Sequence, residues 1–112
     1  MIIKTDDYRI ECIDPTRAVI IGSLRLPTPS AYEPHFKPIK EKIEKLRDPY
    51  TINITKVSFL NSSGITAFAR LIFFAKEHNV PIIIEASETI PWQEKTITSL
   101  GKLWSKVSIQ FS

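Results

Sequence analysis

The sequence has little cysteine and glycine and no long hydrophobic run, and each absence excludes a class of protein. The single Cys among 112 residues excludes an internal disulfide framework and a cysteine-rich zinc site. With 3 Gly and 8 Pro, the chain is neither collagen-like nor linker-like. No apolar run approaches the roughly 20 residues of a membrane span, and acidic residues interrupt the N-terminal segment where a secretory signal would stay apolar. We therefore expect a reduced, cytoplasmic protein.

The composition is typical of one globular domain. Hydrophobic residues make up 43% and charged residues 24%, which argues against disorder. A length of 112 residues fits a single domain over residues 1–112. The net charge is +3, but basic and acidic side chains mix between residues 37 and 48, as on a solvated helix face. Because no dedicated basic stripe is visible, we expect neither nucleic acid nor a membrane as a partner.

Hydrophobic periodicity predicts where the strands and helices lie. Alternation with period two, or a short apolar run, predicts strands at residues 8–13, 18–22, 50–59, 80–85 and 107–111. Apolar residues at helical spacing predict helices over residues 32–46 and 63–78 and from Pro91 onward. We expect Ser30 to cap the first helix, Pro38 to kink it or delay its start, and Asn79 to cap the end of the second.

The predicted order of elements defines a fold class. The first two strands form a hairpin, and strands then alternate with helices in the order ββαβαβαβ. Such alternation implies right-handed crossovers between parallel strands. The sequence therefore predicts an α/β fold with a mostly parallel central sheet of about five strands and three helices.

Residues that could catalyse a reaction are sparse and have structural explanations. No glycine-rich dinucleotide or phosphate loop is present. His35 lies early in an amphipathic helix, and His78 lies at a helix end, where the dipole favours a cation. Cys12 lies on the apolar face of a strand and is interpreted as a small core residue. With no carboxylate pair and no metal-ligand spacing, the chain is predicted to be no enzyme and to need no cofactor or metal.

The most informative segment joins an apolar strand to a helix through Asn61-Ser62-Ser63-Gly64. Asn and Ser are preferred N-cap residues because their side chains accept hydrogen bonds from unpaired backbone N–H groups. The same N–H groups and the helix dipole favour negative charge, so a phosphate on a serine would be accommodated here. The alternative is ordinary capping, in which the two serines only begin a helix.

Residues 57–72, VSFLNSSGITAFARLI, resemble the STAS domain motif of bacterial anti-sigma factor antagonists. In that family an apolar strand precedes Asp-Ser-Ser-Gly and a helix rich in Leu, Ile and Ala, and the element order is similar across nearly the whole chain. The resemblance implies that Ser62 is phosphorylated by a serine kinase that is itself the anti-sigma factor or a related regulator. The unphosphorylated form would bind this partner, phosphorylation would release it, and a phosphatase would reverse the modification.

The resemblance also implies a docking surface around Ser62, and the chain departs from the family pattern there. Asn61 replaces the usual Asp, and the segment from Gly22 to Arg25 lacks the family's acidic residues. Arg25 is expected either to face a phosphate on Ser62 or to be an exposed residue that ends a strand. The residues expected to contact a partner are Asn61, Ser63, Gly64, Ile65, Thr66 and Arg25.

The helix after the motif carries a second apolar stripe, formed by Ala67, Leu71 and Phe74, beside the stripe expected to face the core. This stripe could bind a partner or a second copy of the chain, or a neighbouring helix could cover it. An alternative function is therefore a constitutive STAS-like binding or scaffolding module, including a homodimer, that works without phosphorylation.

Overall fold

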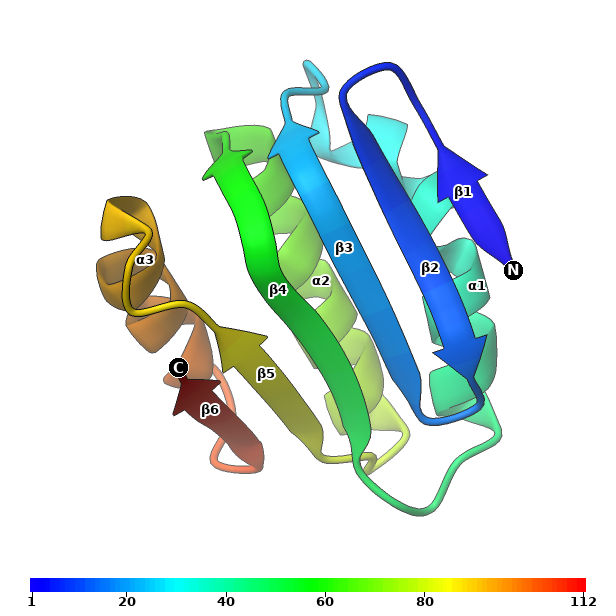
Figure 1. Cartoon of the computed structure of the whole chain (residues 1–112). Helices are drawn as coiled ribbons and strands as arrows, with labels where there is room; N and C mark the ends of the chain where they lie inside the picture. Colours follow the sequence, from blue (N-terminus) through cyan, green and yellow to red (C-terminus); the bar gives the residue numbers. More distant parts are fainter.

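The computed structural model describes all 112 residues and forms one six-stranded sheet with three α-helices (Figure 1). The elements in chain order are β1 (Ile2–Lys4), β2 (Tyr8–Asp14), β3 (Arg17–Leu24), a 3₁₀ turn (Pro29–Tyr32), α1 (Glu33–Glu44), β4 (Tyr50–Leu60), α2 (Ser62–Glu77), β5 (Ile82–Ala86), α3 (Pro91–Gly101) and β6 (Val107–Phe111).

The strands follow one another across the sheet in the order of the chain, from β1 to β6. The pairs β1–β2 and β2–β3 are antiparallel, and every pair from β3 to β6 is parallel. The predicted hairpin and the predicted parallel sheet are both present. The number of strands was underestimated, because β1 has only three residues and is too short to show a period.

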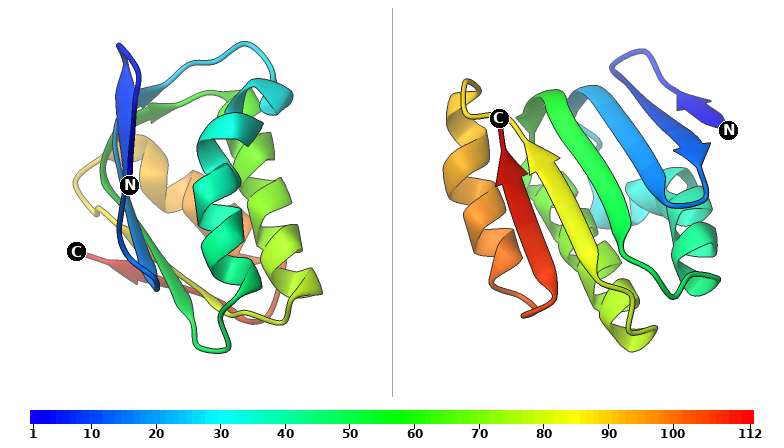
Figure 2. Two further views of the ribbon diagram at one scale, coloured as in Figure 1. Left: turned by 90° about the vertical axis from the view of Figure 1, so that its right-hand side faces the viewer. Right: turned by 60° about the horizontal axis from the view of Figure 1, so that its bottom comes forward.

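All three helices lie on the same face of the sheet, and the other face carries no helix (Figure 2). The arrangement follows from the topology, because each parallel crossover moves one strand in the same direction and with the same hand. α2 lies behind β3 and β4 and α1 lies behind β2 toward the β1 edge, while α3 lies beside β5 and β6 (Figure 1). The protein is therefore a two-layer α/β fold.

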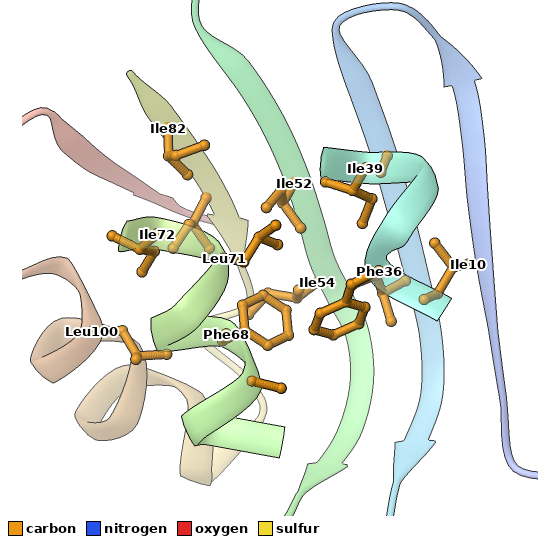
Figure 3. Packing of buried hydrophobic residues seen from close by; sticks show 14 of the residues in the cluster. Ile10, Phe36, Ile39, Ile52, Ile54, Phe68, Leu71, Ile72, Ile82 and Leu100 are labelled. Carbon is orange, nitrogen blue, oxygen red and sulfur yellow. The ribbon is translucent and has the colours of Figure 1, made fainter. Parts of the chain in front are cut away.

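The hydrophobic core fills the space between this helix layer and the sheet. Along β4, Tyr50, Ile52 and Ile54 are buried and alternate with half-buried residues, as the period of a strand requires. In Figure 3, Phe68 of α2 lies beside Phe36 of α1 in front of the sheet. The two rings pack edge to face, with their centroids 5.5 Å apart. Cys12 is also buried, as predicted for a core residue.

The start of the first helix differs from the prediction. Thr28, and not Ser30, caps the 3₁₀ turn, because its side chain accepts a hydrogen bond from the backbone N–H of Ala31. The α-helix follows directly at Glu33, so Pro38 lies inside the helix and does not delay its start. The C-cap of the second helix is His78, one residue before the predicted Asn79, which follows it with a positive φ of 54°, a conformation common just beyond a helix end.

Burial of all three tyrosines leads to a prediction at alkaline pH. Loss of hydration, with a contribution from Tyr32, raises the pKa of Tyr8 to about 12, and burial also raises the pKa values of Tyr32 and Tyr50 above the ordinary 10.0. The tyrosines of the unfolded chain ionise at a lower pH than the buried ones. The contribution of the neutral buried tyrosines to the free energy of unfolding is therefore complete below pH 10 and is lost as the pH rises toward about 12. We expect tyrosinate absorbance to appear together with the loss of circular dichroism. Absorbance that appears near pH 10 in the folded protein would contradict this.

Candidate functional site

The Asn61–Gly64 segment lies where β4 ends and α2 begins, at the carboxyl end of the parallel strands. Asn61 is the N-cap of α2, with an extended backbone (φ −77°, ψ 173°). Its side-chain oxygen accepts a hydrogen bond of 2.8 Å from the N–H of Gly64, and its backbone oxygen accepts the first helical bond, from Ile65. Both expectations for this segment, a strand end and a capped helix start, are confirmed.

The Asn61 side chain also joins this helix start to the loop that follows β3. Its amide nitrogen donates to the carbonyl oxygen of Leu26 at 2.8 Å. Its oxygen accepts a second hydrogen bond, at 3.1 Å, from the hydroxyl of Tyr32, which in turn accepts from the backbone N–H of Leu26 at 3.0 Å. One amide therefore connects three segments, and it uses both a donor and an acceptor to do so.

This network explains why an asparagine suits the position and predicts the effect of Asn61→Asp. The carboxylate keeps the bonds from Gly64 and Tyr32, but it has no hydrogen to donate to Leu26 and faces that carbonyl with negative charge. The favourable charge at the helix N-terminus offsets part of the loss. We expect a net loss of about 1 kcal/mol in the free energy of unfolding, measured by chemical denaturation. A variant as stable as the wild type would contradict a contribution from the Leu26 bond.

The two serines of the motif differ in what their hydroxyl groups do. Ser62 is the first residue of α2, its side chain is exposed, and its hydroxyl makes no hydrogen bond within the chain. The hydroxyl of Ser63 instead donates to the carbonyl oxygen of Pro27 at 3.1 Å. Ser62 is therefore the serine that presents a free hydroxyl to solvent, while Ser63 holds the loop after β3 in place.

Gly64 is buried in the first turn of α2, and its small size lets the helix approach the strand end. A Cβ added there would lie 2.4 Å from the Cδ1 atom of Leu60 and 3.2 Å from the side-chain oxygen of Asn61. A larger residue would push on the capping group itself. Gly64 is therefore a structural part of the site and is not available to a partner.

Two other residues predicted to contact a partner, Ile65 and Thr66, lie at the start of the side of α2 that faces α3. Ile65 is half-buried and Thr66 is exposed, and both line a groove between the two helices. Arg25 is exposed, and its guanidinium lies 4.5 Å from the centre of the Phe59 ring. It makes no ion pair, so the structure shows it as a residue that ends a strand and covers an exposed aromatic side chain.

The prediction that Ala67, Leu71 and Phe74 form an exposed interface stripe is wrong. Ala67 is 4% exposed and Leu71 is fully buried, because α1 packs against this side of α2. Phe74 is half-buried, and the Lys40 ammonium group of α1 lies 5.4 Å from the centre of its ring. The alternative, that a neighbouring helix covers the stripe, is what the structure shows.

The histidines have the structural roles that the sequence suggested. His35 forms a hydrogen bond with the hydroxyl of Tyr8, and the ring of His78 packs on Phe74 and contacts its carbonyl oxygen at 3.0 Å. No three His, Cys, Asp or Glu side chains are arranged to hold a metal ion. None of the helices has both the length and the apolar content needed for a membrane span.

Sequence reasoning missed the two residues that attach α3 to the edge of β4. Gln93 is fully buried, and its amide nitrogen donates to the carbonyl oxygens of Ile54 and Val57 at 2.8 and 2.9 Å. The indole N–H of Trp92 donates to the carbonyl oxygen of Ser58 at 2.9 Å. Beside an acidic residue in the first turn of α3, Gln93 looks like an ordinary exposed polar residue, and the partners on β4 lie more than thirty positions earlier in the chain.

Comparisons with known proteins do not assign the chain to a family. A scan against protein-family models gives no match, and searches of curated proteins and of solved structures give no significant match. The site is therefore interpreted from its own geometry and from the motif in the sequence.

Proposed function

We propose that this protein is a STAS-like protein-interaction switch, similar to anti-sigma factor antagonists, that is controlled by phosphorylation of Ser62. The observation that carries the proposal is the free, exposed hydroxyl of Ser62 at the first position of α2, next to a serine whose hydroxyl is already bonded. The two-layer fold with sequential parallel strands, and the motif at the carboxyl end of β4, are in keeping with it.

The switch follows from the electrostatics of a helix N-terminus. A phosphate adds about −1.5 to −2 charges, which the N–H groups and dipole of α2 tolerate while the site is solvated. Burying the same charge in an interface without a matching cation is costly. Phosphorylation can thus release a partner and leave the domain folded. The kinase, an anti-sigma factor or related regulator, and the phosphatase supply the chemistry, so the protein itself is not an enzyme.

A constitutive binding module is the second candidate, and the Asn61 network favours it. The helix start is held by neutral hydrogen bonds to Leu26 and Tyr32, so its geometry does not depend on the acidic residue that the family carries. A module of this kind would bind its partner, or a second copy, whatever the state of Ser62. Because α1 covers Ala67 and Leu71, such a surface would have to lie elsewhere on the domain.

The two candidates differ in how they respond to charge at Ser62. Wild type, Ser62→Ala and Ser62→Asp are used to capture partners from an extract of the source cells, and phosphopeptides of the native protein are mapped by mass spectrometry. For a captured kinase-like partner, we expect Ser62→Asp to lower the affinity at least about tenfold and Ser62→Ala to keep it. Phosphate should map to Ser62.

Ser105→Asp is the matched control, because this exposed serine precedes β6 at the opposite end of the parallel strands. It should bind like wild type. If native Ser62 carries no phosphate and all variants recover the same partners equally, the switch is wrong and the constitutive module is the better account.

A further inference from the structure

Between α2 and α3 the surface is hollowed into a groove with a volume of about 460 Å³. Four of its lining residues are apolar, Ile65 and Ala69 from α2 and Leu100 and Leu103 from the α3 side, and the remainder are Thr66, Lys95, Thr96 and Ser99. Leu100 on α3 and Ile72 on α2 belong to the same cluster of core side chains (Figure 3). The groove therefore has an apolar base that continues into the core.

The groove is continuous with the proposed switch. Ile65 and Thr66 are its first residues on α2, and Ser62 lies one turn earlier on the same helix. In the other direction, Phe73 lies one turn beyond Ala69 and is 44% exposed, so it extends the apolar strip along α2. α1 covers the opposite side of α2, and on this side the apolar residues Ile65, Ala69 and Phe73 stay partly exposed.

The charge at the groove indicates what kind of surface fits it. Lys95 is the only charged residue among those that line the groove, and its ammonium group makes no ion pair. Lys102, at the C-cap of α3, is also unpaired, but it lies outside the groove, in a shallower hollow that Lys95 and Glu94 line with it. A second copy docked groove to groove would bring no carboxylate from the groove lining to Lys95, and each chain carries a net charge of +3. An occupant that carries carboxylates matches the groove better.

We propose that this groove binds an amphipathic helix of the partner protein, with apolar side chains in the groove and an acidic residue facing Lys95. A helix laid in a groove of this kind uses apolar anchors at spacings of three and four residues. The proposal rests on the proposed function, and it names the chemistry of the partner segment that the Ser62 surface recognises.

The test uses two synthetic helical peptides of about 15 residues, a length at which an isolated helix becomes marginally stable. Both peptides carry leucines at spacings of three and four residues. Along one flank, the acidic peptide has glutamates at the positions where the basic peptide has lysines. Binding is followed by backbone amide shifts in NMR spectra of the whole chain. We expect the acidic peptide to shift Ile65, Ala69 and Leu103 and to bind about tenfold more tightly than the basic one.

Two variants make the result specific to the groove. Lys95→Glu should reverse the preference between the peptides, and Ala69→Arg, at a half-buried position on the groove wall, should abolish binding of both while the spectrum stays folded. Lys4→Glu on β1 is the matched control and should leave the preference unchanged. The proposal is overturned if the amide shifts fall outside the groove or if Lys95→Glu leaves the preference between the peptides unchanged. It is also overturned if the groove residues shift with protein concentration alone, because this would show that a second copy of the chain occupies the groove.

The result of the peptide experiment can be distinguished from the result of the Ser62 experiment. None of these variants alters Ser62, and the peptides need no kinase. Loss of groove binding with an intact response to Ser62→Asp would leave the switch standing and refute only the docking mode. Groove binding in a protein whose Ser62 is never phosphorylated would support the docking mode on a constitutive module.

Discussion

Gln93→Leu is expected to lower the free energy of unfolding by about 3 kcal/mol or more. In the wild type the amide of Gln93 donates to the carbonyl oxygens of Ile54 and Val57, and its oxygen accepts from the N–H of Ser87 at 2.8 Å. Leucine fills a similar volume but leaves two carbonyls and one N–H without these partners. Each buried polar group left unpaired costs about 1–3 kcal/mol. Chemical denaturation measures the loss.

The expected loss of stability is large because Gln93 makes hydrogen bonds to β4 at a place where no neighbouring strand can make them. β5 pairs with β4 only as far as Asn53, opposite Glu85, so the carbonyl groups further along this edge of β4 have no strand beside them. The buried amide bridges the gap between β4 and Ser87 in place of a ladder. Removing it leaves only the Trp92 indole to hydrogen-bond the N-terminus of α3 to β4.

Two comparisons isolate this effect. Gln110→Leu is the matched control, because Gln110 is exposed on β6 and its side chain makes no hydrogen bond, so we expect a change within about 0.5 kcal/mol. Gln93→Glu should be at least as harmful as Gln93→Leu at neutral pH, since its carboxylate would face the carbonyl oxygens of Ile54 and Val57. A loss below about 1 kcal/mol for Gln93→Leu would show that water replaces the amide.

Gly22→Ala is expected to destabilise the fold by about 3 kcal/mol. Gly22 has a φ of +116°, a conformation that side chains rarely adopt, and a Cβ there would lie 2.4 Å from the carbonyl oxygen of Asp7. That oxygen is held by the backbone N–H of Ser23 at 3.0 Å, so it cannot move aside without breaking the β2–β3 pairing. At about 4–8 °C for each kcal/mol, the melting temperature should fall by roughly 12 °C or more.

Gly101→Ala is the matched control for this substitution. Its Cβ would meet only the Cδ1 and Cγ1 atoms of Ile109, the nearest at 2.6 Å, and these belong to a side chain that can rotate. Alanine also favours the helix by up to about 1 kcal/mol, which offsets the crowding. We expect the melting temperature of Gly101→Ala to change little. An equal loss in both variants would mean that crowding alone, and not backbone conformation, governs Gly22.

The sequence determined the order of elements from β2 to β6, because these strands and helices follow from local periodicity, whereas the three residues of β1 are too few to show a period. Tyr8, Ile10 and Cys12 alternate along β2, and apolar residues three and four apart mark α1 and α2. The position of the motif was also determined locally. An asparagine followed by two serines and a glycine after an apolar strand predicts a capped helix start, and the structure has Ser62 exposed at its first position.

Only the tertiary structure decided which surfaces stay open. The periodicity of α2 shows two apolar stripes, but the packing of α1 buries Ala67 and Leu71 and leaves the side of Ile65 and Ala69 as the groove. Likewise, nothing local shows that Ser63 bonds to Pro27 or that Gln93 reaches β4. These contacts join residues more than thirty positions apart, and they depend on the order of strands in the sheet, whereas a sequence pattern reports only neighbours within a few turns.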